Sequence, residues 1–273
     1  MNVKQLQQMP PWQWPEEAGA LLRDLLADRD ADPSDRLVAV ELAGDYTVID
    51  DNLVGALLTI LRDGQESEDL RATAAISLGP VLEQADLMGF EDLDDILVSE
   101  KVFLGLQKSL RTLFLDSDVP TLVRRRILEA SVRAPMEWHP GAVRKAFASA
   151  EDDWRLTAVF CMGFIEGFDE EILGALKDDD PSIHYHAVRA AGNWELDDAW
   201  DYVLSLALST QTERTLRLAA IDAVVGIRPE EASMALTDVM GDTDEEIVEA
   251  VFEALAMSSA IADLDDDVEE DNF

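Results

Sequence analysis

The sequence predicts an all-α solenoid, in which about seven helix pairs stack into a superhelix. Three observations support this fold class. A short motif recurs along most of the 273 residues, each copy of the motif has apolar residues at helical spacing, and a turn rich in Asp and Ser precedes most copies. No run of alternating apolar and polar residues, which would indicate a half-buried strand, competes with the helical pattern.

The recurring motif starts with an arginine, which small or apolar residues follow at three, four, seven and eight positions. After Arg71 these positions hold Ala74, Ala75, Leu78 and Gly79. The first three form one face of a helix. The glycine suits a helix end, where the backbone turns left-handed or a neighbouring segment approaches closely. Further copies begin at Arg36, Arg155 and Arg217, the last with its glycine one place late at Gly226, and His184 takes the arginine position in another copy. Two weaker copies without the glycine begin at Arg124 and Val248.

Each motif is expected to form the first helix of a pair. Asp and Ser in turns such as 32–35, 67–69 and 179–182 are predicted to cap these helices, because their side chains accept hydrogen bonds from free backbone N–H groups. Two short helices bury their apolar faces only when such pairs stack on one another. The second helices are predicted from Leu53, Leu57, Leu58 and Leu61, from Phe103, Leu106, Leu110 and Leu113, from Val143 with Phe147, from Ile172 with Leu176, from Val203, Leu204 and Leu208, and from Leu236 with Val239.

The pattern Asp-x-x-[Val/Ile/Leu]-Arg-x-x-Ala-Ala-x-x-Leu-Gly resembles the HEAT repeat, particularly the short bacterial form that also occurs in phycobilisome lyases. Residues 67–79, Ser-Glu-Asp-Leu-Arg-Ala-Thr-Ala-Ala-Ile-Ser-Leu-Gly, are the clearest match, and the resemblance covers about residues 30–258. In that family the repeated arginine stacks along the solenoid and pairs with acids of the neighbouring turn. The resemblance therefore implies a structural ladder formed by Arg36, Arg71, Arg124, Arg155 and Arg217.

Three segments fall outside the regular repeat. Residues 1–29 are predicted to cap the first repeat, with Trp12 or Trp14 covering its exposed end. Residues 80–100 are predicted to be an acidic insertion in the second repeat, in the form of a long loop. The solenoid is predicted to span residues 30–258, and residues 259–273 to form a solvated acidic tail.

Charge is the most unusual property of the sequence. With 58 acidic and 21 basic residues, the formal net charge is −37. Nucleic acids and anionic lipids are bound through Lys and Arg, so this charge argues against both and favours a basic or amphipathic protein partner. The 34 Asp and 5 Lys also fit adaptation to a salty cytoplasm, with ordinary solubility as the alternative explanation.

Cellular location and cofactors are predicted from what the sequence does not contain. It shows neither an apolar run long enough to span a bilayer nor a secretory signal, so a cytoplasmic protein without membrane contact is expected. The single cysteine, Cys161, excludes an internal disulfide and a Cys-rich zinc site. No cofactor is predicted, and the oligomeric state is left open.

All three histidines, the cysteine and three of the six tryptophans lie within residues 138–194. Cys161 occupies a position where other copies of the motif have small or apolar residues, which favours packing over catalysis. His184 and His186 are two positions apart, so they face different sides of a helix and do not form a metal-binding pair. His139 is expected in a turn. We therefore predict neither catalytic nor metal-ligating residues.

A binding patch is nevertheless predicted within this region. Equivalent positions of stacked repeats lie side by side, and aromatic and cationic side chains are enriched at binding hot spots. These two rules select Trp154, Arg155, His184 and His186. Trp194, at the opposite end of its helix, is expected to pack into the core between repeats.

Two functions from different classes remain open on sequence grounds. The favoured one is a non-catalytic scaffold that binds a basic or amphipathic protein segment along the face formed by the second helices. The alternative, which the resemblance permits, is a chromophore-lyase-like enzyme or a small-ligand carrier with its site in residues 138–194. The absence of a catalytic motif places the enzyme second.

Overall fold

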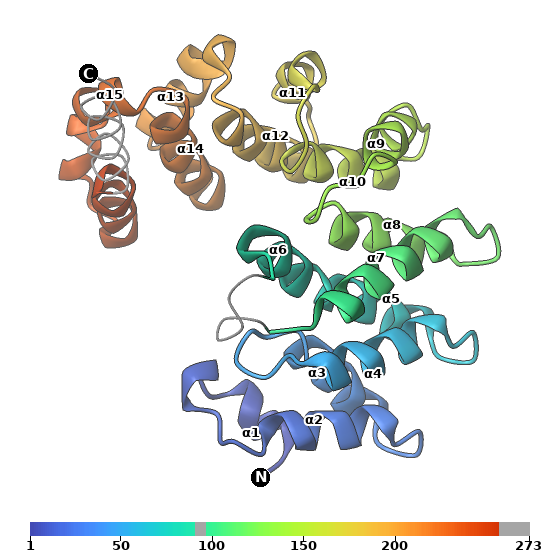
Figure 1. Cartoon of the computed structure of the whole chain (residues 1–273). Coiled ribbons are helices and arrows are strands. Elements are labelled where there is room, and N and C mark those ends of the chain that lie inside the picture. The colour runs from blue at the N-terminus through green and yellow to red at the C-terminus, as the bar shows by residue number, and fades with distance from the viewer. Residues whose placement is uncertain (91–96, 257–273) are drawn as a thin grey trace, which may run out of the picture. The chain divides into compact units, whose positions relative to one another are not determined.

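The structure, a computed structural model, describes residues 1–90 and 97–256. These residues form helices joined by turns, and no strand occurs among them (Figure 1). The predicted all-α solenoid is thus confirmed. The chain divides into two compact units, Met1–Ala142 and Val143–Phe273.

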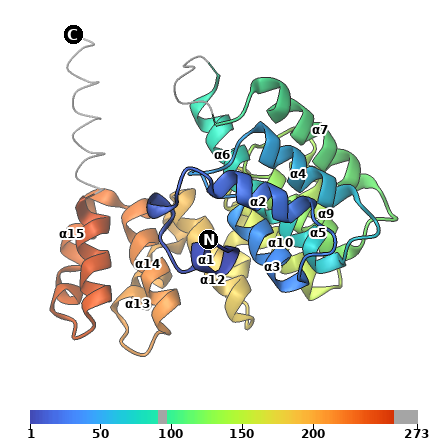
Figure 2. The same ribbon diagram turned by 90° about the horizontal axis from the view of Figure 1, so that it is seen from below.

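The first unit has two layers of helices. The first helices of successive pairs pack on one another in the order α3, α5, α8. On the other layer the capping helix α2 packs against α4, and α4 packs against α7 (Figure 2). The helices are α1 (Val3–Gln7), α2 (Ala18–Ala27), α3 (Pro33–Leu42), α4 (Asp51–Arg62), α5 (Glu68–Ser77), α6 (Gly79–Met88), α7 (Glu100–Leu115) and α8 (Thr121–Ser131), with a short 3-10 helix η1 (Pro11–Gln13).

The second unit continues the same alternation. Its first helices α10, α12 and α14 pack on one another, and α11, α13 and α15 follow them along the chain. Helix α9 (His139–Phe147) crosses the division between the units. The remaining elements are α10 (Asp152–Met162), α11 (Asp169–Ala175), α12 (Pro181–Asn193), η2 (Asp197–Ala199), α13 (Trp200–Leu208), α14 (Arg214–Ile227), α15 (Pro229–Ala235) and η3 (Thr237–Gly241).

The described residues contain six successive helix pairs and the first helix of a seventh, residues 245–256. The second helix of that pair and the acidic tail, 259–273, lie outside the described residues. The last complete pair departs from the prediction. Its second helix ends at Ala235, and the predicted stripe of Leu236 and Val239 continues in the 3-10 helix η3.

The apolar stripes of the motif form the core. Ala74, Ala75 and Leu78 are fully buried, and the predicted caps occur where the turns supply them. The side chain of Asp32 accepts hydrogen bonds from the backbone N–H groups of Ser34 and Asp35, and equivalent caps are formed by Ser67 and Asp180. Two stripe residues were assigned wrongly, because Leu208 and Phe252, both predicted to be buried, are 42% and 57% exposed.

The motif glycines allow close helix approach rather than a left-handed turn. A Cβ atom on Gly44 would lie 2.3 Å from the carbonyl oxygen of Ser77, and one on Gly192 would lie 2.6 Å from the Cα atom of Ala223. Neither glycine has a positive φ angle, and among the described residues only Gly89, Gly167 and Glu195 do. Successive first helices therefore touch through backbone at these points.

Two segments lie outside the regular repeat among the described residues. Trp14 is half-buried and its indole N–H donates to the carbonyl oxygens of Leu6 and Met9, whereas Trp12 is 80% exposed. The insertion predicted as a long loop begins with helix α6, which packs against α8. Residues 91–96 of the insertion lie outside the described residues.

Candidate functional site

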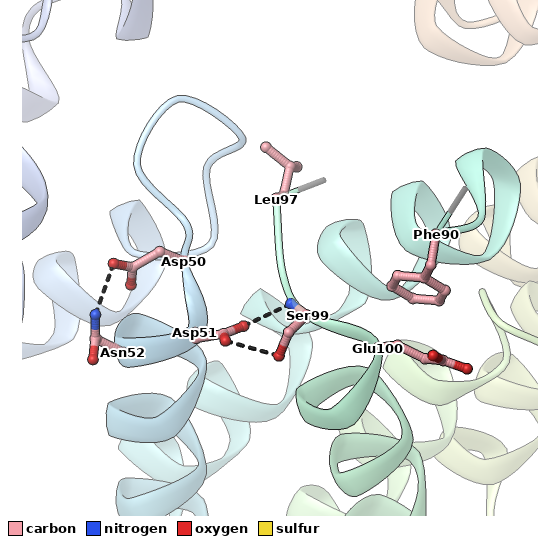
Figure 3. A pocket seen from close by; sticks show the side chains of 7 residues that line it. All are labelled: Asp50, Asp51, Asn52, Phe90, Leu97, Ser99 and Glu100. Carbon is pink, nitrogen blue, oxygen red and sulfur yellow. Dashed lines mark hydrogen bonds between the residues drawn. The ribbon is translucent and has the colours of Figure 1, made fainter. Parts of the chain in front are cut away.

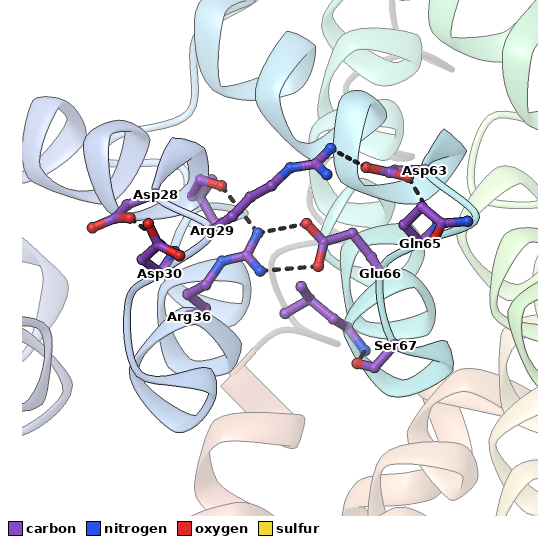
Figure 4. A network of polar contacts seen from close by, with 10 residues as sticks. Asp28, Arg29, Asp30, Arg36, Asp63, Gln65, Glu66 and Ser67 are labelled. Atoms are coloured by element: carbon purple, nitrogen blue, oxygen red, sulfur yellow. Dashed lines mark hydrogen bonds and ion pairs between the residues drawn. The ribbon is translucent and has the colours of Figure 1, made fainter.

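The first ladder arginine is held by a network of polar contacts between neighbouring repeats (Figure 4). Both terminal nitrogens of Arg36 donate to the carboxylate of Glu66, at 2.9 and 2.8 Å, and one also donates to the carbonyl oxygen of Leu26 at 3.2 Å. Arg36 is 7% exposed. The paired hydrogen bonds lower the pKa of Glu66 and raise the pKa of Arg36, so both groups stay charged.

Three more ladder arginines bind a carbonyl oxygen ten residues earlier in the chain, as Arg36 does. The Nε atoms of Arg71, Arg124 and Arg217 donate to the carbonyl oxygens of Leu61, Phe114 and Ala207, at 3.0, 2.9 and 2.9 Å. Each acceptor lies in the last turn of the preceding second helix, where carbonyl groups have no partner within the helix. These arginines therefore act as C-terminal caps, which is a structural role.

Arg155 and His184 have different partners. The guanidinium of Arg155 pairs with Asp178 at 2.5 Å and lies 5.7 Å from the ring centre of Phe147. His184 Nε2 is 3.0 Å from the hydroxyl oxygen of Tyr202. Burial lowers the pKa of His184, and the negative charge of Asp178 partly opposes that shift. Asp178 thus lies close to both predicted patch residues.

The other two predicted patch residues, His186 and Trp154, are half-buried on α12 and α10. His186 packs edge-on against Phe160 of the preceding first helix, with ring centres 5.3 Å apart. Trp154 is half-buried near the start of α10. The structure therefore brings Arg155 and His184 together around Asp178, whereas His186 faces another side of its helix, in line with the two-residue spacing.

His139 was expected in a turn, but it is the first residue of α9 and is fully buried. Its Nδ1 atom accepts from the backbone N–H of Met136 at 2.8 Å, so the proton of the neutral ring is on Nε2, 3.0 Å from the hydroxyl oxygen of Ser131. Burial lowers the pKa of His139 to about 4. Its ring also stacks on Trp138, with centres 3.9 Å apart.

The remaining candidates for chemistry are engaged in packing. Cys161 is fully buried, and the indole N–H of Trp194 donates to the carbonyl oxygen of Met162 at 2.7 Å. Within residues 1–90 and 97–256, no group of three His, Cys, Asp or Glu side chains is arranged to hold a metal ion. No helix of the described part is long and apolar enough to cross a membrane.

An open depression of about 500 Å³ lies at the N-termini of α4 and α7, away from the region that the sequence selected (Figure 3). Asp51 closes one side, because its carboxylate accepts hydrogen bonds from the backbone N–H and the hydroxyl group of Ser99, both at 2.8 Å. Phe90 and Glu100 line the other side. These contacts are those of helix capping, and they present no pair of groups suited to acid–base chemistry.

The second helices of the second unit carry exposed acids beside exposed apolar side chains. Arg228 connects these elements, because it pairs with Asp197 of η2 and Glu231 of α15 and lies 4.9 Å from the ring centre of Trp200 in α13. Helices α13 and α15 themselves contain neither Lys nor Arg. The exposed acids are Asp197, Asp198, Asp201, Glu230, Glu231 and Asp238, and the exposed large apolar residues are Tyr202, Leu208 and Met234. We call this surface the acidic face.

Sequence reasoning missed the acidic face for an identifiable reason. Acids are frequent throughout the chain, so their number alone marks no site. The sequence does place acids next to apolar residues that lie outside the predicted core stripes, and this pattern could have indicated the face. Met234, which is 81% exposed, is an example. Leu208 has the same character but had been assigned to the core.

Comparisons with known proteins found one family match and several similar solved structures. A family model of HEAT repeats matches residues 169–256. Among solved structures, YibA of Escherichia coli aligns over 90% of this chain and 84% of its own, with 14% identity and a TM-score of 0.46. Human deoxyhypusine hydroxylase in complex with glycerol aligns over 94% and 96%, with 15% identity and a TM-score of 0.41. An engineered protein aligns over 76% and 96%, with 18% identity and a TM-score of 0.41. No curated protein matches the sequence.

The stacked helix pairs and the arginine caps between them define an all-α repeat protein of the solenoid class. Residues 169–256 are HEAT repeats, as the recurring arginine and alanine positions predicted.

Proposed function

We propose that the protein is a non-catalytic cytoplasmic scaffold that binds a basic, amphipathic protein segment on the acidic face of α13 and α15. The observation that carries this proposal is the combination of exposed carboxylates with three exposed large apolar side chains on helices that contain no base. An amphipathic helix with Lys or Arg beside its apolar stripe matches both properties. An acidic surface that served only solubility would not need Met234 or Leu208.

The predicted patch adjoins this face at one point. His184 contacts Tyr202, and Tyr202 is 39% exposed on α13. We propose that His184 and Arg155 orient Tyr202 and Asp178 for the partner. Trp154 and His186, which are half-buried, would contribute at the edge of the contact.

The proposal is tested with a pair of exposed apolar residues and a matched control pair. Leu208→Ser with Met234→Ser alters the acidic face, and Trp12→Ser with Leu87→Ser alters side chains that are 80% and 79% exposed in the first unit. We expect the first variant to lose basic proteins that the wild-type chain retains from its native cytoplasm, while the control retains them. Equal retention by both variants would contradict the proposal.

A chromophore-lyase-like enzyme or small-ligand carrier with a site at 138–194 stays the second candidate function. The contacts favour it less, because His139 and Cys161 are fully buried and Trp194 is bonded to a backbone carbonyl. Retention of a small molecule through Arg155, His184 and Tyr202, lost in Tyr202→Phe, would instead favour the carrier.

A further inference from the structure

Helix α7 has a second stripe of residues on the side that faces away from the core. Its buried stripe consists of Phe103, Leu106, Leu110 and Phe114. The other stripe consists of Lys101, Leu104, Lys108, Arg111 and Leu115, all of them exposed. These five residues follow one another at intervals of three and four positions, which is the spacing of a coiled-coil seam. We call this stripe the α7 seam.

The α7 seam is positively charged in a chain whose net charge is −37. No acid occurs in residues 101–115 of α7 or in residues 52–62 of the adjacent helix α4, although 58 of the 273 residues are acidic. Arg62 of α4 is exposed and donates to the hydroxyl oxygen of Ser109, which places a fourth cation beside the seam. Acids stand only at the ends of α7, at Glu100 and Asp116.

The apolar positions of the seam are open to a partner. Leu104 is 53% and Leu115 is 66% exposed. A Cβ atom on Gly105, beside Leu104, or on Gly55, on the exposed side of α4, would meet no atom within 4 Å. An approaching helix would therefore find two apolar anchors, separated by about three turns, with cations before and between them.

We propose that the α7 seam binds an acidic amphipathic helix of a partner protein. The spacing of the seam residues matches that of a partner helix. On that helix, apolar residues would contact Leu104 and Leu115, and acids beside them would face the four cations. Charges on a surface are screened beyond about 10 Å at 0.1 M salt, so the local cations attract such a segment despite the net charge of the chain. Nucleic acid fits less well, because four cations and two leucines are far from the basic footprint that a phosphate backbone requires.

The α7 seam lies on a different helix from the acidic face, and its charge and that of its partner are opposite to those proposed there. The two proposals can therefore fail separately. The probe is a synthetic three-heptad peptide with Leu at positions a and d and Glu at positions e and g, where repulsion between Glu residues disfavours self-pairing. Its binding to the full chain is followed by fluorescence anisotropy. The test variant is Lys108→Glu with Arg111→Glu. The matched control, Lys145→Glu with Lys177→Glu, changes the net charge equally at exposed positions outside α7.

We expect the peptide to bind the wild-type chain and the control variant alike, and to bind the test variant at least about tenfold more weakly. The double variant Leu104→Ser with Leu115→Ser should weaken peptide binding by a similar factor. The double variant Leu208→Ser with Met234→Ser, on the acidic face, should leave peptide binding unchanged. Lack of binding to the wild-type chain, or equal losses in test and control variants, would overturn the proposal. So would a preference of the seam for a single-stranded oligonucleotide or anionic vesicles. Self-association of the chain that the test variant abolishes would assign the seam to a second copy instead.

Discussion

The buried imidazole of His139 makes the free energy of unfolding depend on pH. The pKa of His139 is about 4 in the folded chain, against 6.5 for an ordinary histidine, because burial disfavours the charged ring. As the pH falls, the unfolded chain therefore takes up a proton before the folded chain does. The stabilising contribution of the neutral ring is complete above about pH 6.5 and is lost as the pH falls towards the folded pKa.

The size of this effect follows from the two pKa values. Their difference, from 6.5 to about 4, corresponds to about 3 kcal/mol at 1.36 kcal/mol per pKa unit. The variant His139→Asn keeps an acceptor for the backbone N–H of Met136 but has no group that gains a proton. We expect the wild-type chain to lose about 3 kcal/mol of stability relative to this variant between about pH 7 and about pH 4.

Urea unfolding followed by circular dichroism at several pH values measures this difference. The carboxylates titrate in both proteins and largely cancel, and the volume lost in the variant costs the same free energy at every pH. A ring resonance of His139 that does not titrate between about pH 7 and pH 5 would be the direct signature in NMR spectra. A stability difference that stays constant down to about pH 4 would refute the reasoning, since it would mean that the fold admits the charged imidazole.

Three further predictions concern stability. Gly192→Ala should lower the free energy of unfolding by about 1–3 kcal/mol, because the new Cβ would lie 2.6 Å from the Cα atom of Ala223. At Gly55 nothing lies within 4 Å of an added Cβ, so Gly55→Ala should raise the free energy of unfolding by about 0.5–1 kcal/mol in the same urea titration. Glu66→Gln should lower the free energy of unfolding by about 3 kcal/mol, because it leaves the guanidinium of Arg36 buried without its charge partner. Arg29→Gln removes an exposed pair with Asp63 and should leave the melting temperature nearly unchanged. Added sodium chloride should raise the melting temperature of the wild-type chain, because ions screen the mutual repulsion of 58 acids against 21 bases; a flat or falling midpoint would show that the arginine pairs outweigh that repulsion.

The sequence predicted the first helices well because their pattern depends on local packing rules. A first helix in the centre of a solenoid touches neighbours on two sides, so only small residues fit at positions such as Ala74 and Ala187, and both are fully buried. The same closeness explains the glycines, although the sequence did not decide between close approach and a left-handed turn. The surroundings of His139 could not be predicted, because its contacts are with Ser131 at the end of α8 and with Met136 in the irregular stretch between α8 and α9.

The second helices were harder to interpret because some carry two apolar stripes. Helix α7 has leucines on both sides, and the sequence alone does not say which stripe the core covers. Packing against α8 and α4 covers Phe103 and Leu106 and leaves Leu104 outside. In α13 the stripe of Val203 and Leu208 was extended one turn too far, because that helix ends at Leu208. Leu208 lies five positions after Val203, which turns it about 140° away from the buried side of the helix.

The net charge of a repeat protein says less about its partners than the charge of each helix face does. A partner helix samples only the charges within about 10 Å at moderate salt. For the acidic face, these are the carboxylates around Tyr202 and Met234; for the α7 seam, they are cations around Leu104. Because each repeat contacts only its neighbours, the exposed residues of one second helix can be positively charged and those of another negatively charged without any effect on the core. A chain with a net charge of −37 can thus present one surface to basic helices and another to acidic ones, and the two proposed variants, at Leu208 with Met234 and at Lys108 with Arg111, should abolish these interactions independently.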